Sequence, residues 1–230
     1  MNISTVLFDL DGTLIDSFAA IQQSLETTFS EAGLTGASSE DYLQYLSTSG
    51  GQLAVAFKQL ELEQGSNLNL MPRYRKAYWN KEPGLVNLYP GVEDMLGQLK
   101  AMDMNLGLVT QKNWSVDLDG QLVGAARELE ELGVLNLFSA GVGFENVTNY
   151  KPHPEGVFLA LRQLGVKSGE TILVGDSLAD MKAGRSAGCS IHLATWGHIF
   201  GTDASTSINV DYILEKPSDL IQFLSDNQIS

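Results

Sequence analysis

The stretch Thr5-Val-Leu-Phe-Asp-Leu-Asp-Gly-Thr-Leu-Ile-Asp-Ser17 places two carboxylates directly after a short apolar run. That run, residues 6–8, has the composition of a buried parallel strand, and in open α/β sheets the chemistry lies just past the carboxyl ends of such strands. Gly12 follows Asp11 and permits a turn, because glycine adopts backbone angles that other residues avoid. The stretch therefore predicts a strand end that presents a carboxylate and then bends away.

The composition is that of a folded, acidic protein. The chain has 230 residues, 43% hydrophobic and 18% charged, which suits one large domain or a domain with an insert. Its formal charge of −14 argues against nucleic acid and anionic membrane surfaces as partners. We find neither a signal-peptide pattern nor an apolar run of membrane-spanning length. Cys189 is the single cysteine, so we expect no intrachain disulfide and a cytoplasmic protein.

The segment that follows the opening stretch predicts helices without intervening strands. Apolar residues recur there at helical spacing, and Gly33 stands where the first helix should end. A turn at Glu82-Pro83-Gly84 closes the block. Successive amphipathic helices of this kind predict a compact helical domain over residues 16–84. The expected helices are residues 17–32, 38–46, 53–60 and 70–79.

From Tyr89 onward, helix and strand patterns alternate. Such alternation predicts an α/β fold, with a parallel sheet covered by helices on both faces. We assign residues 1–15 and 85–230 to this core, and we expect Leu122 and Phe158 to face inward from their helices. The expected strands are residues 105–109, 138–142, 171–176, 190–193 and 211–214, and the expected helices are residues 92–99, 119–132, 154–164 and 217–224.

Polar side chains recur where the expected strands stop. Parallel neighbouring strands end at the same edge of a sheet, so their terminal side chains are expected to meet. Together they would supply several carboxylates, one hydroxyl and one ammonium group. The side chains in question are Asp9, Asp11, Thr110, Lys151, Asp176 and Asp180, and Gln111 and Lys112 follow Thr110 at its strand end.

Crowded carboxylates repel each other, and at neutral pH they need protons or a hard cation. Mg²⁺ is the expected cation, because it takes oxygen ligands and also accepts a phosphate oxygen. Thr110 and Lys151 could hold the remaining phosphate oxygens. Asp9 could then attack phosphorus and form an aspartyl-phosphate, while Asp11 protonates the leaving oxygen and later activates water. These residues predict Mg²⁺-dependent phosphoryl transfer.

The chain resembles the haloacid dehalogenase-like hydrolase superfamily at all four of that superfamily's motifs, in order. The helical insert directly after the first motif is similar to the phosphoglycolate phosphatase-like branch, in which a helical cap closes over the site. The resemblance covers essentially the whole chain, and it implies a Rossmann-like core with an inserted cap. The matching residues are Phe8-Asp9-Leu10-Asp11-Gly12-Thr13-Leu14, Thr110, Lys151-Pro152 and Gly175-Asp176-Ser177 with Asp180.

Carried over residue by residue, the resemblance implies that Asp9 is the nucleophile and Asp11 the acid/base. It implies that Mg²⁺ is bound by Asp9, by the main-chain carbonyl of Asp11 and by Asp176. Phosphate binding, and support of the cluster, would fall to Thr110, Lys151 and Asp180.

One departure from the family pattern lies between Thr110 and Lys151. Residues 114–124 make this connection longer than usual. Because the residues at both ends retain suitable chemistry, we expect a loop insertion that leaves the site in place.

The expected activity is hydrolysis of a small phosphorylated metabolite, with 2-phosphoglycolate as one candidate. A sugar phosphomutase or a pyrophosphatase would use the same core, so both alternatives stay open. A 2-haloacid dehalogenase is disfavoured because it has no need of the acid that Asp11 supplies. The pairing of Asp9 with Asp11 also disfavours a non-catalytic, phosphate-binding regulatory protein. A monomer and a homodimer are equally compatible with the sequence.

Substrate selection is expected to fall to the helical domain. The segment Ser47-Thr48-Ser49-Gly50-Gly51 can approach a ligand closely, and backbone N–H groups at the start of the next helix can bind an anion. Arg73 could bind a second anionic group of the substrate. Ser49, Gly50 and Arg73 are therefore the candidate specificity residues.

Overall fold

The computed structural model describes residues 3–34, 36–43, 53–197 and 209–228. Residue contacts divide the chain into two compact units. Of the described residues, 3–15, 88–197 and 209–228 belong to the larger unit, and 16–34, 36–43 and 53–87 belong to the smaller one.

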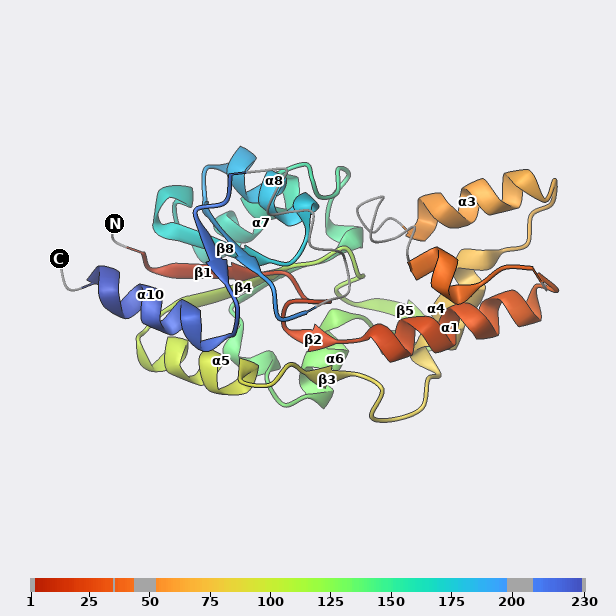
Figure 1. Ribbon diagram of the computed structural model, residues 1–230, viewed down its shortest axis with the longest axis horizontal. Helices are drawn as coiled ribbons and strands as arrows, with labels where there is room; N and C mark the ends of the chain where they lie inside the picture. Colours follow the sequence, from red (N-terminus) through yellow and green to blue (C-terminus); the bar gives the residue numbers. More distant parts are fainter. Residues whose placement is uncertain (1–2, 35, 44–52, 198–208, 229–230) are drawn as a thin grey trace. The chain divides into compact units, whose positions relative to one another are not determined.

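Six strands of the larger unit form one sheet (Figure 1), and every neighbouring pair is parallel. Their order is β10-β9-β8-β1-β4-β7, so β1 lies between β8 and β4. The polar residues that follow these three strands are therefore brought to one edge of the sheet. The strands are β1 (Thr5–Phe8), β4 (Asn105–Val109), β7 (Ala140–Val142), β8 (Thr171–Gly175), β9 (Ser190–Ala194) and β10 (Tyr212–Leu214).

Helices cover both faces of this sheet, with α7 and α8 on one face and α5 and α10 on the other (Figure 1). Helix α7 packs on β4 and β7, and α8 packs on β8 and β9. The predicted α/β core, with a parallel sheet and helices on both faces, is confirmed. The helices are α5 (Val92–Ala101), α6 (Ala125–Glu131), α7 (Glu155–Leu164), α8 (Leu178–Ala187) and α10 (Ser218–Gln228).

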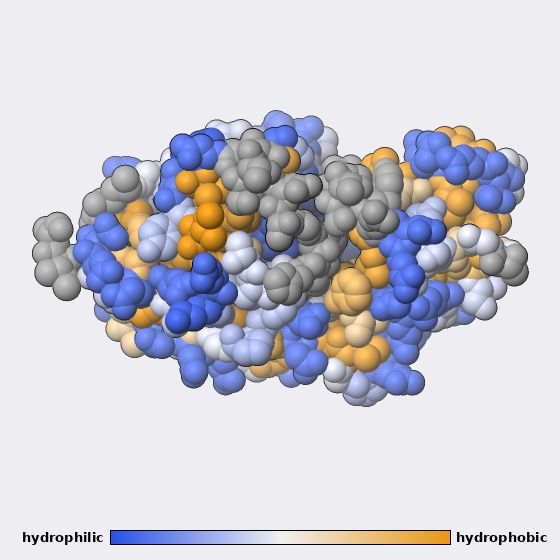
Figure 2. Space-filling view, in the orientation of Figure 1, coloured by the Kyte–Doolittle hydropathy of each residue, from blue (hydrophilic) through white to orange (hydrophobic). Residues whose placement is uncertain are grey.

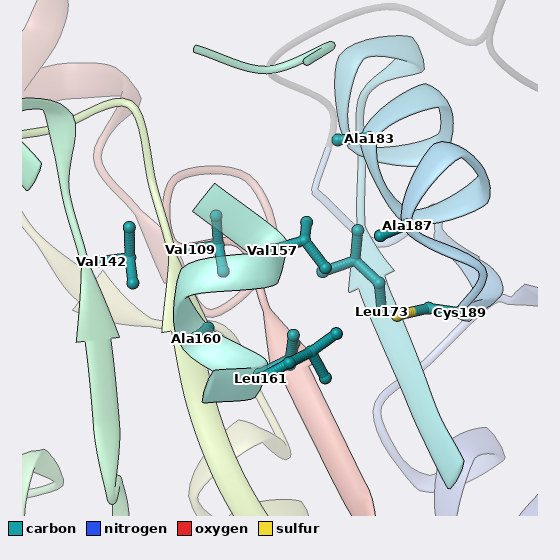
Figure 3. Close-up of a cluster of buried hydrophobic side chains, with 10 residues drawn as sticks. Val109, Val142, Val157, Ala160, Leu161, Leu173, Ala183, Ala187 and Cys189 are labelled. Atoms are coloured by element: carbon teal, nitrogen blue, oxygen red, sulfur yellow. The ribbon is translucent and has the colours of Figure 1, made fainter. Parts of the chain in front are cut away.

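The core beneath α7 and α8 is a cluster of aliphatic side chains (Figure 3), in which Val109, Val142 and Leu173 come from strands and Val157 from α7. Burying one such side chain contributes roughly 1.5–3 kcal/mol. The cluster therefore fixes the strands whose ends carry the polar residues. Cys189 belongs to it, and burial raises the pKa of its thiol to about 12, which fits a packing role rather than a reactive one.

The predicted helix over residues 119–132 is wrong over residues 119–124. A hairpin precedes the helix, with β5 (Val116–Leu118) antiparallel to β6 (Gln121–Val123), and α6 begins only at Ala125. The turn is Asp119-Gly120, where both residues have positive φ, 54° and 85°. An Asp-Gly pair with two positive φ values matches the twist of a two-residue hairpin. Leu122 is consequently 67% exposed and does not face the core.

Phe158 also fails to face inward, since it is 47% exposed. The buried stripe of α7 includes Val157 and Leu161, which are four residues apart. Phe158 follows Val157 directly, so its side chain lies about 100° around the helix axis from that of Val157.

The smaller unit is helical, with α1 (Phe18–Glu31), α3 (Leu53–Glu63) and α4 (Leu70–Trp79), and residues 39–43 are helical as well. Its core contains Phe29, Phe57 and Tyr78. The chain enters and leaves this unit through β2 (Ile15–Asp16) and β3 (Asn87–Leu88), which form a two-stranded sheet. That this unit acts as a cap stays a prediction.

Figure 2 shows a largely hydrophilic face on which apolar residues form several separate groups. None of the helices in the described part of the chain combines the length and the apolar character that crossing a membrane requires.

Candidate active site

A tight turn follows β1 and begins with the two aspartates. The N–H of Asp9 donates to the carbonyl of Val174 at 2.9 Å, which holds Asp9 against β8. Gly12, with φ of 83°, then reverses the chain, and its N–H donates to the carbonyl of Ile15 at 3.0 Å. The chain therefore returns on itself directly after presenting Asp9 and Asp11.

Lys151 is the counter-ion of the buried acids. Its ammonium lies 2.6 Å from Oδ1 of Asp9 and 2.6 Å from Oδ1 of Asp180, and it donates to the carbonyl of Val109 at 2.9 Å. The three N–H bonds of an ammonium group match these three acceptors. Lys151 is only 5% exposed, so it holds Asp9 and Asp180 together in surroundings with little water.

Three buried carboxylates, those of Asp9, Asp176 and Asp180, offer oxygen atoms within 4.8 Å of one another. Asp176 follows β8 directly. Asp180 lies in the first turn of α8, where its carboxylate accepts the N–H of Ser177 at 3.2 Å and the Ser177 hydroxyl at 2.5 Å. This capping box fixes the side chain of Asp180 beside the cluster.

The donor set at this cluster fits Mg²⁺. Both carboxylate oxygens of Asp176 are buried and have no hydrogen-bond partner among the residues that the structure describes. A buried carboxylate without a partner is costly, whereas carboxylate oxygens are the ligands that Mg²⁺ prefers. Asp176, together with Asp9, is therefore suited to hold the ion.

The charge state of the cluster reflects its burial. Burial raises the pKa of Asp9 to about 7, against the opposing attraction of Lys151, and the Asp180 carboxylate adds to the rise. Burial, followed by repulsion from Asp9 and Asp180, holds the pKa of Asp176 well above its ordinary value. Burial alone would lower the pKa of Lys151, but the carboxylates of Asp180 and Asp9 raise it on balance. The acids repel one another, and a cation would relieve that repulsion.

Thr110 follows β4 directly. It is buried, and its Oγ1 accepts the N–H of Lys112 at 3.1 Å. Thr110 and Lys151 line the same small cavity near the ends of β4 and β7. The structure thus places Thr110 and Lys151 together, at the same sheet edge as Asp9.

Two further charged residues lie near Asp11. Lys112 was expected at this strand end but was given no role, and Glu128 was missed in the sequence. The Lys112 ammonium lies 2.8 Å from Oδ1 of Asp11 and 2.7 Å from Oε2 of Glu128. Burial alone would lower the pKa of Lys112, but Asp11 and Glu128 raise it on balance. The signal for Lys112 was its place two residues after Thr110. Glu128 could have been noticed because it is an acidic residue beside the apolar helix face that Ala125 and Leu129 form.

Of the three candidate specificity residues, Arg73 alone lies within the described part of the chain. Ser49 and Gly50 lie outside the described residues. Arg73 bonds within the smaller unit, where its Nε donates to the carbonyl of Leu68 at 3.0 Å and its guanidinium lies 3.7 Å from the Glu31 carboxylate. Its expected role in substrate selection stays a prediction.

Comparison with known proteins gives a consistent family assignment. A family model described as haloacid dehalogenase-like hydrolase matches residues 6–194. A protein named Pyrophosphatase PpaX from Oceanobacillus iheyensis is 31% identical, over 99% of this chain and 99% of its own length. A protein named Phosphoglycolate phosphatase from Salmonella typhimurium is 30% identical, over 99% of this chain and 96% of its own length.

The fold has solved counterparts. The crystal structure of a predicted phosphoglycolate phosphatase from Haemophilus somnus matches with a TM-score of 0.79 and 23% identity. The match covers 97% of this chain and 98% of the other. The same α/β architecture is therefore found in an experimental structure.

Proposed function

Because the chain belongs to the haloacid dehalogenase-like hydrolase family, we propose that it hydrolyses a small phosphomonoester in a Mg²⁺-dependent reaction with Asp9 as the nucleophile. The observation that supports this most directly is the position of Asp9. Its carboxylate is buried at the end of the central strand, 2.6 Å from the Lys151 ammonium. It lies beside the Asp176 carboxylate, whose oxygens have no hydrogen-bond partner among the described residues. The proposed nucleophile and the proposed cation site are thus neighbours.

In the first step, a carboxylate oxygen of Asp9 attacks phosphorus and the bond between phosphorus and the ester oxygen breaks. Asp11, in its protonated form, gives its proton to that ester oxygen, so the alcohol leaves uncharged. In the second step, water attacks the aspartyl-phosphate and loses its proton to Asp11. Inorganic phosphate is released, the Asp9 carboxylate is restored and Asp11 is protonated again.

The remaining groups bind and orient. Thr110 would bind a phosphate oxygen, and Lys151 would bind another in place of one of its three present acceptors. Asp180 keeps the Lys151 ammonium beside Asp9. Asp9, Asp176 and the main-chain carbonyl of Asp11 would hold Mg²⁺, which would neutralise charge on the carboxylates and on the phosphate.

A pyrophosphatase is the second candidate, because the relative from Oceanobacillus iheyensis carries that name. The same steps would apply, with phosphate in place of the alcohol as the leaving group. A phosphoglycolate-like ester remains equally supported by the relative from Salmonella typhimurium.

The experiment is phosphate release by the purified chain from 2-phosphoglycolate, sugar phosphates and pyrophosphate, with Mg²⁺ or with EDTA. We expect turnover in the presence of Mg²⁺ and none in EDTA. The substrate with the highest kcat/KM identifies the substrate class. Asp9→Asn should abolish turnover while the circular dichroism spectrum is retained. The matched control is Asp94→Asn, at an exposed position on α5, which should keep full activity. Robust turnover by Asp9→Asn would overturn the nucleophile assignment.

A further inference from the structure

The carboxylate of Asp11 is held by a chain of charges that begins inside the fold. Lys112 lies two residues past the end of β4, and its ammonium lies 2.8 Å from Oδ1 of Asp11. On its other side, the same ammonium lies 2.7 Å from Oε2 of Glu128. The side chains of Asp11 and Lys112 are 18% and 16% exposed, whereas that of Glu128 is 2% exposed. This series of three charged side chains therefore extends from the buried Glu128 to Asp11 at the edge of the site.

A buried glutamate at this place requires an explanation. Glu128 lies in the first turn of α6, between the buried residues Ala125 and Leu129. An ionised carboxylate is costly to bury unless a charge of opposite sign is directly bonded to it. Lys112 supplies that charge. The pairing restricts the long, flexible lysine side chain to one position, because the ammonium must stay in contact with Glu128.

Helix α6 is itself fixed to the edge of the sheet. The N–H groups of Ala125 and Ala126 donate to the carbonyls of Asn113 and Trp114, at 2.8 and 3.1 Å. Glu145 accepts the N–H of Trp114 at 2.8 Å. The Trp114 ring lies so close to Gly141 on β7 that a Cβ there would lie 2.2 Å from it. Asn113 and Trp114, which precede the hairpin, thus connect the start of α6 to β7, and the position of Glu128 follows from that anchor.

We propose that Glu128, acting through Lys112, positions the Asp11 carboxylate for proton transfer, an inference that rests on the phosphatase function proposed above. Glu128 and Lys112 are positioning residues. Neither exchanges a proton in the reaction, and their effect is to keep Asp11 from rotating away from the leaving oxygen. The longer connection between β4 and the Lys151 loop acquires a role in this way, since it carries and anchors the helix on which Glu128 lies.

The test compares two kinds of ester. An alkyl ester such as 2-phosphoglycolate needs a proton on its leaving oxygen, whereas p-nitrophenyl phosphate releases a stable anion and does not. Because kcat/KM reports the steps up to cleavage of the ester bond, Glu128→Gln should lower it about 10-fold or more for the alkyl ester. The loss for p-nitrophenyl phosphate should be less than about 3-fold. An equal loss for both esters, or no loss for either, would overturn the proposal.

A matched control and a double variant complete this test. Glu131→Gln, on the same helix, removes an exposed acid that pairs with Arg127, and it should change neither rate. If Glu128 acts through Lys112, adding Glu128→Gln to Lys112→Met should cost less than about 2-fold more. If the losses in kcat/KM caused by Glu128→Gln and Lys112→Met are fully additive, Glu128 does not act through Lys112.

A structural measurement separates this proposal from the proposed function. In crystals of the wild-type chain we expect the contact between Lys112 and Asp11 at 2.8 Å, and in crystals of Glu128→Gln we expect it to be lost or shared between rotamers. This outcome is independent of the substrate. If the wild-type chain cleaves no ester, the proposed function is refuted but the positioning role is not. If the contact between Lys112 and Asp11 is unchanged in Glu128→Gln, the positioning role is refuted.

Discussion

A Cβ atom on Gly12 would lie 2.1 Å from Oδ2 of Asp176, so the turn after β1 and the loop after β8 are in direct contact at this pair. Gly12 also has φ of 83°, which side chains with a Cβ rarely adopt. Two independent requirements therefore converge on one glycine. The backbone must turn there, and the Asp176 carboxylate must reach the position that the turn leaves open.

Gly12→Ala should remove activity by displacing the Asp176 carboxylate. We expect a loss of stability of about 1–2 kcal/mol from the positive φ alone. Phosphate release should fall at least about 100-fold, because a misplaced group at the reacting centre has that effect. The control is Gly133→Ala, which has φ of 77° but no atom within 4 Å of the added Cβ. It should lose similar stability and keep its turnover, and an active Gly12→Ala variant would contradict this account.

Asp176→Asn should make the metal-free chain more stable at neutral pH. The pKa of Asp176 is raised in the folded state, so this carboxyl ionises at lower pH in the unfolded chain. The folded state therefore loses stability relative to the unfolded chain as pH rises. Asparagine removes that loss. In EDTA, the melting temperature of the variant should exceed that of the wild type at about pH 8, and the gap should narrow toward about pH 5.

Mg²⁺ should reverse the order of the two proteins. The ion should raise the melting temperature of the wild type, and it should raise that of Asp176→Asn much less, because a ligand stabilises only the state that binds it. If Mg²⁺ raises the melting temperatures of the two proteins equally, Asp176 is not a ligand of the ion.

Lys151→Met should destabilise the chain, because Asp9 and Asp180 would both lose the cation that they share. Removing one partner of a buried ion pair costs about 3–5 kcal/mol, and the cost should shrink at acidic pH as Asp9 takes up a proton. Urea unfolding at two pH values measures this difference. Lys182→Met, at an exposed position on α8, is the control and should be near neutral.

His192 should make the stability fall with acid, independently of the active site. Its ring is fully buried near Tyr212 and Phe223, with Ser190 and Asp211 as its polar neighbours. Burial lowers its pKa from 6.5 to about 4, against the attraction of Asp211. Because the unfolded chain binds this proton at higher pH, stability is complete above about pH 6.5 and decreases by about 3 kcal/mol as pH falls to about 4.

His192→Phe should remove this contribution. The free energy of unfolding of the variant should change less between about pH 6.5 and about pH 4 than that of the wild type. If the free energy of unfolding changes equally with pH in the variant and the wild type, His192 does not titrate over this range.

The parallel core could be read from the sequence because its physical signals are local. Each buried strand is an apolar run, a polar residue follows β1, β4 and β8, and Gly12 signals the turn. The residues of the candidate site follow from the same rule, since the ends of parallel neighbouring strands share an edge. Asp9, Thr110, Lys151 and Asp176 were found in this way.

Other features depend on contacts between segments that are distant in the sequence. Helical spacing continued through Leu122, and only the packing of Trp114 against Gly141 and the positive φ values at residues 119 and 120 reveal a hairpin there. Glu128 is 16 residues from Lys112, and Lys112 is 101 residues from Asp11. No local pattern records that their charges meet. The residue types and the order of the strand ends predicted the chemistry, whereas tertiary packing determined which lysine pairs with which aspartate, because burial leaves each carboxylate only the cation within its reach.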